Sequence, residues 1–189
     1  MSTDSGHRRR ADAVRNRELA LAAATALLAE PDTGLTVEAI ARRAGLGAAT
    51  VVRAFGGKDA LLDAAVAGLL EPVVRRARDL LDEAAPEQAL RTFLAELIAF
   101  QSAHHAINDQ LGGLDLPATT ARRADLVHAV EEMISRARRD GTVRTDLDPA
   151  VATTLIGETA YAIARSRPSE HLTDAYITVL MDGLRPPSP

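Results

Sequence analysis

Apolar residues recur at spacings of three and four along most of the chain, as they do on the buried face of an amphipathic helix. In the first such stretch, about residues 10–30, one helical face carries Ala20, Ala24, Leu27 and Leu28. No segment alternates apolar and polar residues in the way that a half-buried strand does. The pattern therefore predicts an all-α protein.

Turn and capping residues divide this pattern into separate helices. Pro31-Asp32-Thr33-Gly34 ends the first helix, Thr36 can cap the start of the second, and Gly45 ends the second. A long helix follows Lys58, and Pro72 within it is expected to kink or interrupt it. The other predicted helices begin at Pro86 or cover residues 48–54, 119–140, 150–165 and 169–184, with a loop or one short turn at 108–117.

Residues 37–55, with the sequence VEAIARRAGLGAATVVRAF, predict two short helices joined by a tight turn. Ala41 is small enough for the two helices to cross closely, and Gly45 can adopt the positive φ that the turn needs. Apolar side chains that would close a miniature core stand on both sides of the turn: Ile40, Ala44, Leu46 and Val51. This is the helix-turn-helix pattern, in which the second helix enters the major groove of DNA.

The charge of the chain is unevenly distributed. The net charge is −4, but residues 1–58 hold nine basic and six acidic residues, a balance of +3. The remaining 13 basic and 20 acidic residues give the rest of the chain a balance of −7. A basic N-terminal part on an acidic body indicates a polyanion as partner at one end only. This agrees with DNA binding by the helix-turn-helix segment.

Composition excludes several kinds of site. The chain has no cysteine, which excludes disulfides, thiolate metal sites and thiol nucleophiles. An aromatic content of 3%, without tryptophan, argues against a stacking platform for single-stranded nucleic acid. The nearest approach to a helical di-iron motif is Asp125-x-x-His128, so we expect no metal and no cofactor. The apolar run at 19–29 is shorter than the roughly 18 residues that span a bilayer, so we expect a cytoplasmic protein without membrane contact.

Over residues 36–66, TVEAIARRAGLGAATVVRAFGGKDALLDAAV, the sequence resembles the TetR (TetR/AcrR) family of bacterial transcriptional repressors. The shared pattern consists of Ile40-Ala41, Ala44-Gly45, Thr50, Phe55, Lys58 and Leu61-Leu62. Three positions depart from the pattern, because Gly47 replaces a common serine, Ala49 a common glycine, and Val52 a tyrosine that commonly contacts a phosphate. Residues 121–186 also resemble the ligand-binding domain of some members.

The resemblance implies a domain organisation and a mechanism. We expect a disordered arm at 1–7, a helix-turn-helix DNA-binding domain at 8–58, a larger helical ligand-binding and dimerisation domain at 59–185, and a disordered tail at 186–189. A homodimer, paired through the last two helices, would bind a palindromic operator on double-stranded DNA. A small-molecule effector bound in the helical domain would tilt the fourth helix, spread the two DNA-binding domains and release the DNA.

The expected DNA contacts fall into two groups. Residues expected to contact phosphates are Arg8, Arg9, Arg10, Thr36 and Lys58. Residues expected to read base edges are Ala48, Ala49, Thr50 and Arg53, where the alanines and threonine suit a thymine methyl group and the arginine suits guanine. Phe55 is expected to join the small domain to the following helix rather than to stack on a base.

For the effector, the resemblance implies a cavity among the fourth, fifth and seventh helices of the bundle. The candidate lining residues are Phe93, Leu97, Phe100, Gln101 and Met133. An ordinary place in the core or at the surface is the alternative for each of them.

Two other functions compete with that of a ligand-responsive repressor. The acidic body and Val52 favour a helical ligand-binding or adaptor protein without specific DNA binding. A helical hydrolase or metalloenzyme would need a nucleophile, acid or metal motif, and the few serines and the histidines form none, so we expect no enzyme. The operator, the effector and the choice between activation and repression stay open at this stage.

Overall fold

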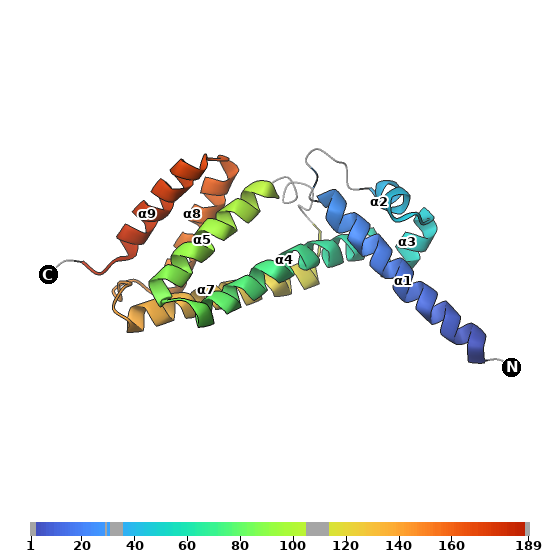
Figure 1. Ribbon diagram of the computed structural model, residues 1–189, viewed down its shortest axis with the longest axis horizontal. Coiled ribbons are helices and arrows are strands. Elements are labelled where there is room, and N and C mark those ends of the chain that lie inside the picture. The colour runs from blue at the N-terminus through green and yellow to red at the C-terminus, as the bar shows by residue number, and fades with distance from the viewer. Residues whose placement is uncertain (1–2, 29, 31–35, 105–113, 188–189) are drawn as a thin grey trace. The chain divides into compact units, whose positions relative to one another are not determined.

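The computed structural model describes residues 3–28, 30, 36–104 and 114–187, with the backbone alone at residues 3–6, 8 and 9. Over these residues the chain forms helices and no strand, so the predicted all-α fold class is confirmed (Figure 1). The helices are α1 (Thr3–Leu28), α2 (Val37–Ala44), α3 (Ala48–Phe55), α4 (Lys58–Glu83), α5 (Pro86–Ala103), α7 (Pro117–Arg139), α8 (Pro149–Arg165) and α9 (Glu170–Leu184).

The chain divides into two compact units. We call residues 1–70 with 106–121 the head, and residues 71–105 with 122–189 the bundle. Helices α4 and α7 each begin in the head and continue into the bundle. The predicted domain boundary between residues 58 and 59 was drawn from the DNA-binding motif alone and stays a prediction.

The head is organised around the turn between α2 and α3. The Thr36 hydroxyl accepts a hydrogen bond of 3.1 Å from the Ala39 N–H and so caps α2. Gly45 ends α2 with φ 67° in the left-handed region, as the sequence predicted. The Leu46 N–H then donates to the Ala41 carbonyl at 2.9 Å, which closes the turn. These local bonds fix how the two helices cross.

Beneath the turn, apolar faces of α1, α2, α3 and α4 form the core of the head. Its fully buried side chains come from each of these helices: Ala20, Ala24, Ile40, Val51, Leu61 and Ala65. Because α1 contributes alanines along much of this face, the short helices α2 and α3 can approach it closely.

The bundle has a separate core, built from the remainder of α4 and α7 together with α5, α8 and α9. An apolar stripe on α5 faces this core, and all its members are buried: Leu90, Phe93, Leu94, Leu97 and Ile98. Asp148 caps α8 by accepting from the Ala150 N–H at 2.8 Å, and Ser169 caps α9.

The structure differs from the sequence prediction at two helices. Residues 1–7 were predicted to be disordered, but helix α1 begins at Thr3, and residues 1 and 2 lie outside the described residues. No proline interrupts residues 3–7, and a helix already formed extends at little cost. Helix α4 continues through Pro72, so the proline does not interrupt it, while the alternative of a kink stays a prediction. Val66 and Val74 are buried on either side of this proline, and such packing compensates for the hydrogen bond that it removes.

The turn glycine provides a direct test of the head. We expect Gly45→Ala to lower the free energy of unfolding by about 1–2 kcal/mol, because an L-residue is strained at φ 67°. The matched control is Gly47→Ser, at φ −74°, where serine can cap α3 and should cause no loss. Urea denaturation followed by circular dichroism measures both, and an equal loss in the two variants would contradict the role given to Gly45.

Candidate nucleic-acid interface

Helix α3 has one face in the core of the head and one face in solvent. Val51 is fully buried and Phe55 is 8% exposed, so both anchor the helix. The exposed positions are Ala49, Val52 and Arg53, and half-buried Ala48 and Thr50 flank them. The side chains on the solvent face of α3 are therefore short, apart from that of Arg53. Short side chains allow a DNA duplex to approach the helix backbone.

The first turn of α3 also offers backbone donors. Gly47 occupies the N-cap position and has no side chain with which to cap the helix. The N–H groups of the first turn thus lack the acceptor that a serine there would supply. A phosphate oxygen is the kind of acceptor that such a helix end binds.

The residues predicted to contact phosphates come from three places in the head. Arg10 is exposed on α1 and Lys58 is exposed as the first residue of α4. Thr36 is exposed, and its hydroxyl hydrogen remains available for a phosphate because the oxygen acts only as acceptor in the α2 cap. Arg8 and Arg9 belong to α1, but their side chains lie outside the described atoms.

The two basic residues of α2 differ in their surroundings. Arg43 forms an ion pair with Glu30, which lies just beyond the end of α1. Arg42 is exposed. The ion pair gives Arg43 a structural role at the surface of the head.

Sequence reasoning missed Arg17, which connects α1 to the end of α3. Its Nη1 donates to the Ala54 carbonyl at 2.8 Å, and its guanidinium carbon lies 4.1 Å from the centre of the Phe55 ring. The arginine thus satisfies a carbonyl in the last turn of α3 and covers the ring that anchors it. The signal was present, because Arg17 precedes Ala20 and Ala24 at helical spacing on the same face of α1.

The predicted effector-lining residues separate into two groups. Phe93, Leu97 and Met133 are buried in the core of the bundle, where α5 packs against its neighbours. Phe100 and Gln101 are half-buried near the end of α5, and the Phe100 ring lies 4.6 Å from that of His104. Among the described residues, no hydrogen-bond partner faces the buried Oε1 of Gln101.

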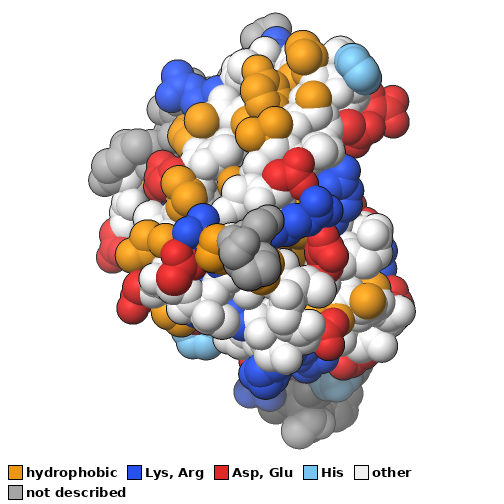
Figure 2. All heavy atoms as spheres, turned by 90° about the vertical axis from the view of Figure 1, so that its left-hand side faces the viewer, with side chains coloured by type: hydrophobic (Ala, Val, Ile, Leu, Met, Phe, Trp, Pro, Cys, Tyr) orange, Lys and Arg blue, Asp and Glu red, His pale blue; other side chains and the backbone are white. Residues whose placement is uncertain are grey.

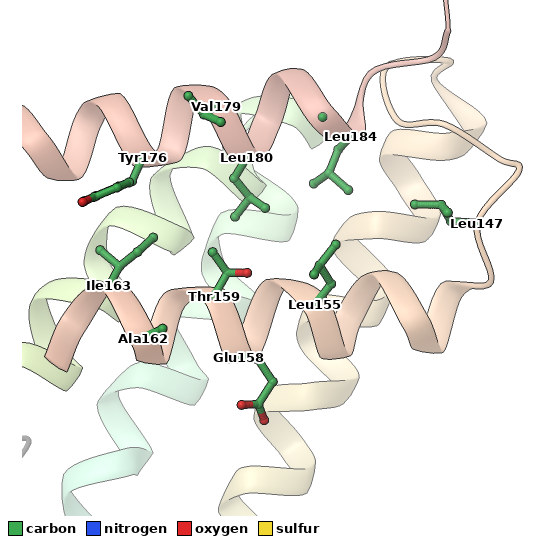
Figure 3. A pocket seen from close by; sticks show the side chains of 11 residues that line it. Leu147, Leu155, Glu158, Thr159, Ala162, Ile163, Tyr176, Val179, Leu180 and Leu184 are labelled. Carbon is green, nitrogen blue, oxygen red and sulfur yellow. The ribbon is translucent and has the colours of Figure 1, made fainter. Parts of the chain in front are cut away.

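A groove of about 670 Å³ runs between α8 and α9 (Figure 3). Leu155 and Val179 line it and are 49% and 72% exposed, so the groove presents aliphatic side chains to solvent. The other lining residues are mostly apolar as well: Leu147, Glu158, Thr159, Ala162, Ile163, Tyr176, Leu180, Gly183 and Leu184. The view of this end of the bundle shows apolar side chains gathered in patches between charged ones (Figure 2).

Within the described part of the chain, no three histidine, aspartate or glutamate side chains are grouped so that they could hold a metal ion. None of the helices among residues 3–28, 36–104 and 114–187 is both long and apolar enough to cross a membrane.

Comparison with known families agrees with the geometry of both units. Residues 20–65 match the model of the tetR family of bacterial regulatory proteins. Residues 85–186 match the C-terminal domain of SbtR-like transcriptional regulators, and this match covers more than half of the chain. The chain belongs to the TetR family. It is therefore a DNA-binding transcription regulator, and the helix-turn-helix of its head is the DNA-binding element of that family.

Solved structures of TetR-family regulators have the same fold. A TetR transcription regulatory protein from Mycobacterium vanbaalenii is 35% identical, with 93% of this chain and 98% of that chain covered and a TM-score of 0.65. A TetR transcriptional regulator from Streptomyces coelicolor is 26% identical, with 91% and 99% covered and a TM-score of 0.66. FadR from Bacillus subtilis, solved in complex with stearoyl-CoA, is 18% identical, with 89% and 99% covered and a TM-score of 0.71. None of the curated proteins compared with this TetR-family chain matches it.

Proposed function

We propose that this regulator is a repressor that binds a near-palindromic operator as a homodimer and is released by a small molecule bound in its bundle. The observation that carries the proposal is the division of α3 into a buried face that fixes it in the head and a small, basic face in solvent. A helix of this kind can enter the major groove without rearrangement of the head.

On DNA, the exposed face of α3 reads bases. Arg53 can donate two hydrogen bonds to guanine, while Ala48, Ala49 and the methyl group of Thr50 suit a thymine methyl. Phosphate contacts come from around this helix, and we assign them to Arg8, Arg9, Arg10, Thr36 and Lys58. Val52 is 37% exposed on α3 but has no group that could donate to a phosphate.

The groove between α8 and α9 supports the homodimer. Exposed aliphatic residues on two neighbouring helices are covered when the same face of a second copy packs against them, and such an interface is two-fold symmetric. Two-fold symmetry places the two recognition helices on DNA half-sites about one helical turn (roughly 34–36 Å) apart, and this predicts a near-palindrome.

The half-buried end of α5 supports a small-molecule effector. The Oε1 of Gln101 is buried and has no hydrogen-bond partner among the described residues, and Phe100, next to it in the sequence, is half-buried. An effector with an apolar body and one hydrogen-bond donor would satisfy that oxygen. We place the apolar body against Phe93, Leu97 and Met133, whose side chains would have to separate to admit it.

Selection of duplexes from a random DNA pool by the purified dimer tests the proposal. We expect a near-palindrome whose affinity falls about 10,000-fold between 50 and 200 mM salt, because the basic residues assigned to phosphates, four in each protomer, release counterions. Compounds that dissociate the selected duplex then identify the effector. If no duplex is selected even at low salt, the chain is a helical ligand-binding or adaptor protein without specific DNA binding.

Two substitutions separate phosphate contact from base reading. We expect Lys58→Ala to weaken binding to all duplexes similarly and to reduce the slope of log affinity against log salt by about one for each phosphate that the lysine neutralises. Arg53→Ala should lower the binding free energy by about 1–3 kcal/mol only where the arginine contacts guanine, so the preference for guanine at those base pairs becomes weaker. Binding curves on a set of single-base variants measure both effects, and an unchanged preference profile in the Arg53 variant would contradict the groove assignment.

A further inference from the structure

Helix α7 begins without a side-chain cap of its own. The Thr120 N–H donates to the Leu116 carbonyl at 2.9 Å, which makes Leu116 the residue that precedes the helix, and its apolar side chain accepts no hydrogen bond. Pro117 has no N–H group. The N–H groups of Ala118 and Thr119 therefore need an acceptor from elsewhere in the chain.

Asp63, on α4, supplies that acceptor. Its Oδ2 accepts from the Ala118 N–H at 2.9 Å and its Oδ1 accepts from the Thr119 N–H at 2.8 Å. In return, the Thr119 hydroxyl donates to the Asp63 carbonyl at 3.3 Å. Asp63 is 6% exposed and Thr119 is 1% exposed, so water does not compete for these bonds. We call this set of three hydrogen bonds the α4–α7 clamp.

The hydrogen bonds of the clamp favour the charged form of the Asp63 carboxyl group. Burial raises the pKa of Asp63, but the hydrogen bonds from Thr119 and Ala118 outweigh burial, and the pKa lies below its ordinary value. The positive end of the α7 dipole stabilises the same negative charge. A buried carboxylate is tolerated only where its bonds are made, so the clamp fixes the register of α7 against α4.

The clamp belongs entirely to the head, yet both helices that it joins continue into the bundle. Within the bundle α4 and α7 remain paired. Arg122 of α7 lies 3.2 Å from Glu71 of α4, and Asp125 of α7 lies 3.7 Å from Arg78 of α4. These pairs are exposed and contribute little to stability. The buried clamp is therefore the strong polar link between the two helices where they leave the head.

We propose that Asp63 is a positioning residue that makes the first turn of α7 part of the DNA-binding head, so that the bundle sets the orientation of the head through two helices instead of one. The inference rests on the proposed function as a dimeric operator-binding regulator. We expect the second connection to narrow the range of separations that the two heads of a dimer can adopt. Without the clamp, α4 alone would carry the head, and the separation would vary.

The test uses the selected operator and versions with one, two or three base pairs inserted between its half-sites. We expect the full-length dimer to lose about 100-fold in affinity when two base pairs are inserted, because both half-sites can no longer be filled together. Asp63→Asn replaces one accepting oxygen by an NH₂ group, so we expect this variant to lose only about tenfold. Affinity for an isolated half-site should stay the same, because the base-reading face is intact. Asp79→Asn, an exposed position on the same helix, is the control and should behave as the wild type.

Two further measurements identify the cause. In Asp63→Asn the amides of Ala118 and Thr119 should exchange hydrogen faster than in the wild type, and the unfolding midpoint should fall by about 5 °C. If that variant does not fold, Thr119→Val provides the test, because it removes only the hydroxyl bond to the Asp63 carbonyl. Inserted base pairs should then lower the operator affinity of Thr119→Val less than that of the wild type, by a smaller difference than expected for Asp63→Asn.

The outcomes separate the inference from the function on which it rests. If the operator affinity of Asp63→Asn still falls about 100-fold when two base pairs are inserted between the half-sites, the inference is overturned and operator binding is left in place. A wild-type chain that selects no duplex would overturn the proposed function and the inference together. The inference is supported if inserted base pairs lower the operator affinity of Asp63→Asn less than that of the wild type, while the affinity for an isolated half-site is unchanged.

Discussion

Val179→Glu should convert the dimer into a monomer and reduce operator affinity about 100-fold or more. Val179 is 72% exposed in the groove between α8 and α9, which we propose to be covered by a second copy. A glutamate there would have to lose its hydration in an apolar interface, at a cost of several kcal/mol. Each monomer would then bind one half-site only and would lose the gain from simultaneous binding. Sedimentation at micromolar protein and operator titration measure the two effects.

His171→Glu is the matched control for this experiment. His171 is exposed on α9 as well, but it does not line the groove, so the same charged residue there should leave the dimer intact. Thermal unfolding of both variants checks that the fold survives. A dimeric Val179→Glu protein with normal operator affinity would show that the groove is not the dimer interface.

Phe55→Ala should abolish operator binding by unfolding the head. Phe55 ends α3, is 8% exposed in the core of the head, and its ring lies beneath the guanidinium of Arg17. Truncation of a buried phenylalanine costs about 3–5 kcal/mol, which is a large part of the stability of a small unit. Because the bundle has its own core, we expect the head to unfold at a lower temperature while the bundle remains folded.

Calorimetry distinguishes these two transitions, and hydrogen exchange assigns them to the head and the bundle. Val52→Ala is the control, since Val52 lies on the exposed face of the same helix and should change stability by less than about 0.5 kcal/mol. If Phe55→Ala binds the operator as the wild type does, the ring is not the anchor of the recognition helix.

The turn of the head could be predicted from the sequence because its signals are local. Thr36 caps the helix that follows it, and Gly45 adopts the positive φ that ends the same helix, so each effect lies within a few residues of its cause. The buried positions of Ile40, Val51 and Phe55 follow from helical spacing in the same short segment.

Contacts between distant residues could not be predicted in this way. Arg17 meets Ala54 across 37 residues, and Asp63 meets Thr119 across 56. In the sequence, Arg17 is one of several arginines and Asp63 is a polar residue in an apolar helical stretch. Only the packing of the helices shows that one covers a ring and the other caps a helix.

The prediction for the start of α1 was wrong for a different reason. Small polar residues at the N-terminus are typical of both disordered arms and the first turns of helices, and composition does not separate the two. The roles of Phe100 and Gln101 in effector binding stay predictions, because a helix face that is half-buried can serve a ligand or a neighbouring helix equally well.

The face of α3 that we propose reads bases is separate from the face that holds the helix in the head, and this has a consequence for evolution. The residues that hold the helix in place, Val51 and Phe55, are separate from the exposed Ala49 and Arg53. Under the proposed function, we expect mutations at the outer positions to change the preferred base sequence at little cost to the free energy of unfolding. A duplicated gene for this protein could acquire a new set of target promoters through a few such changes.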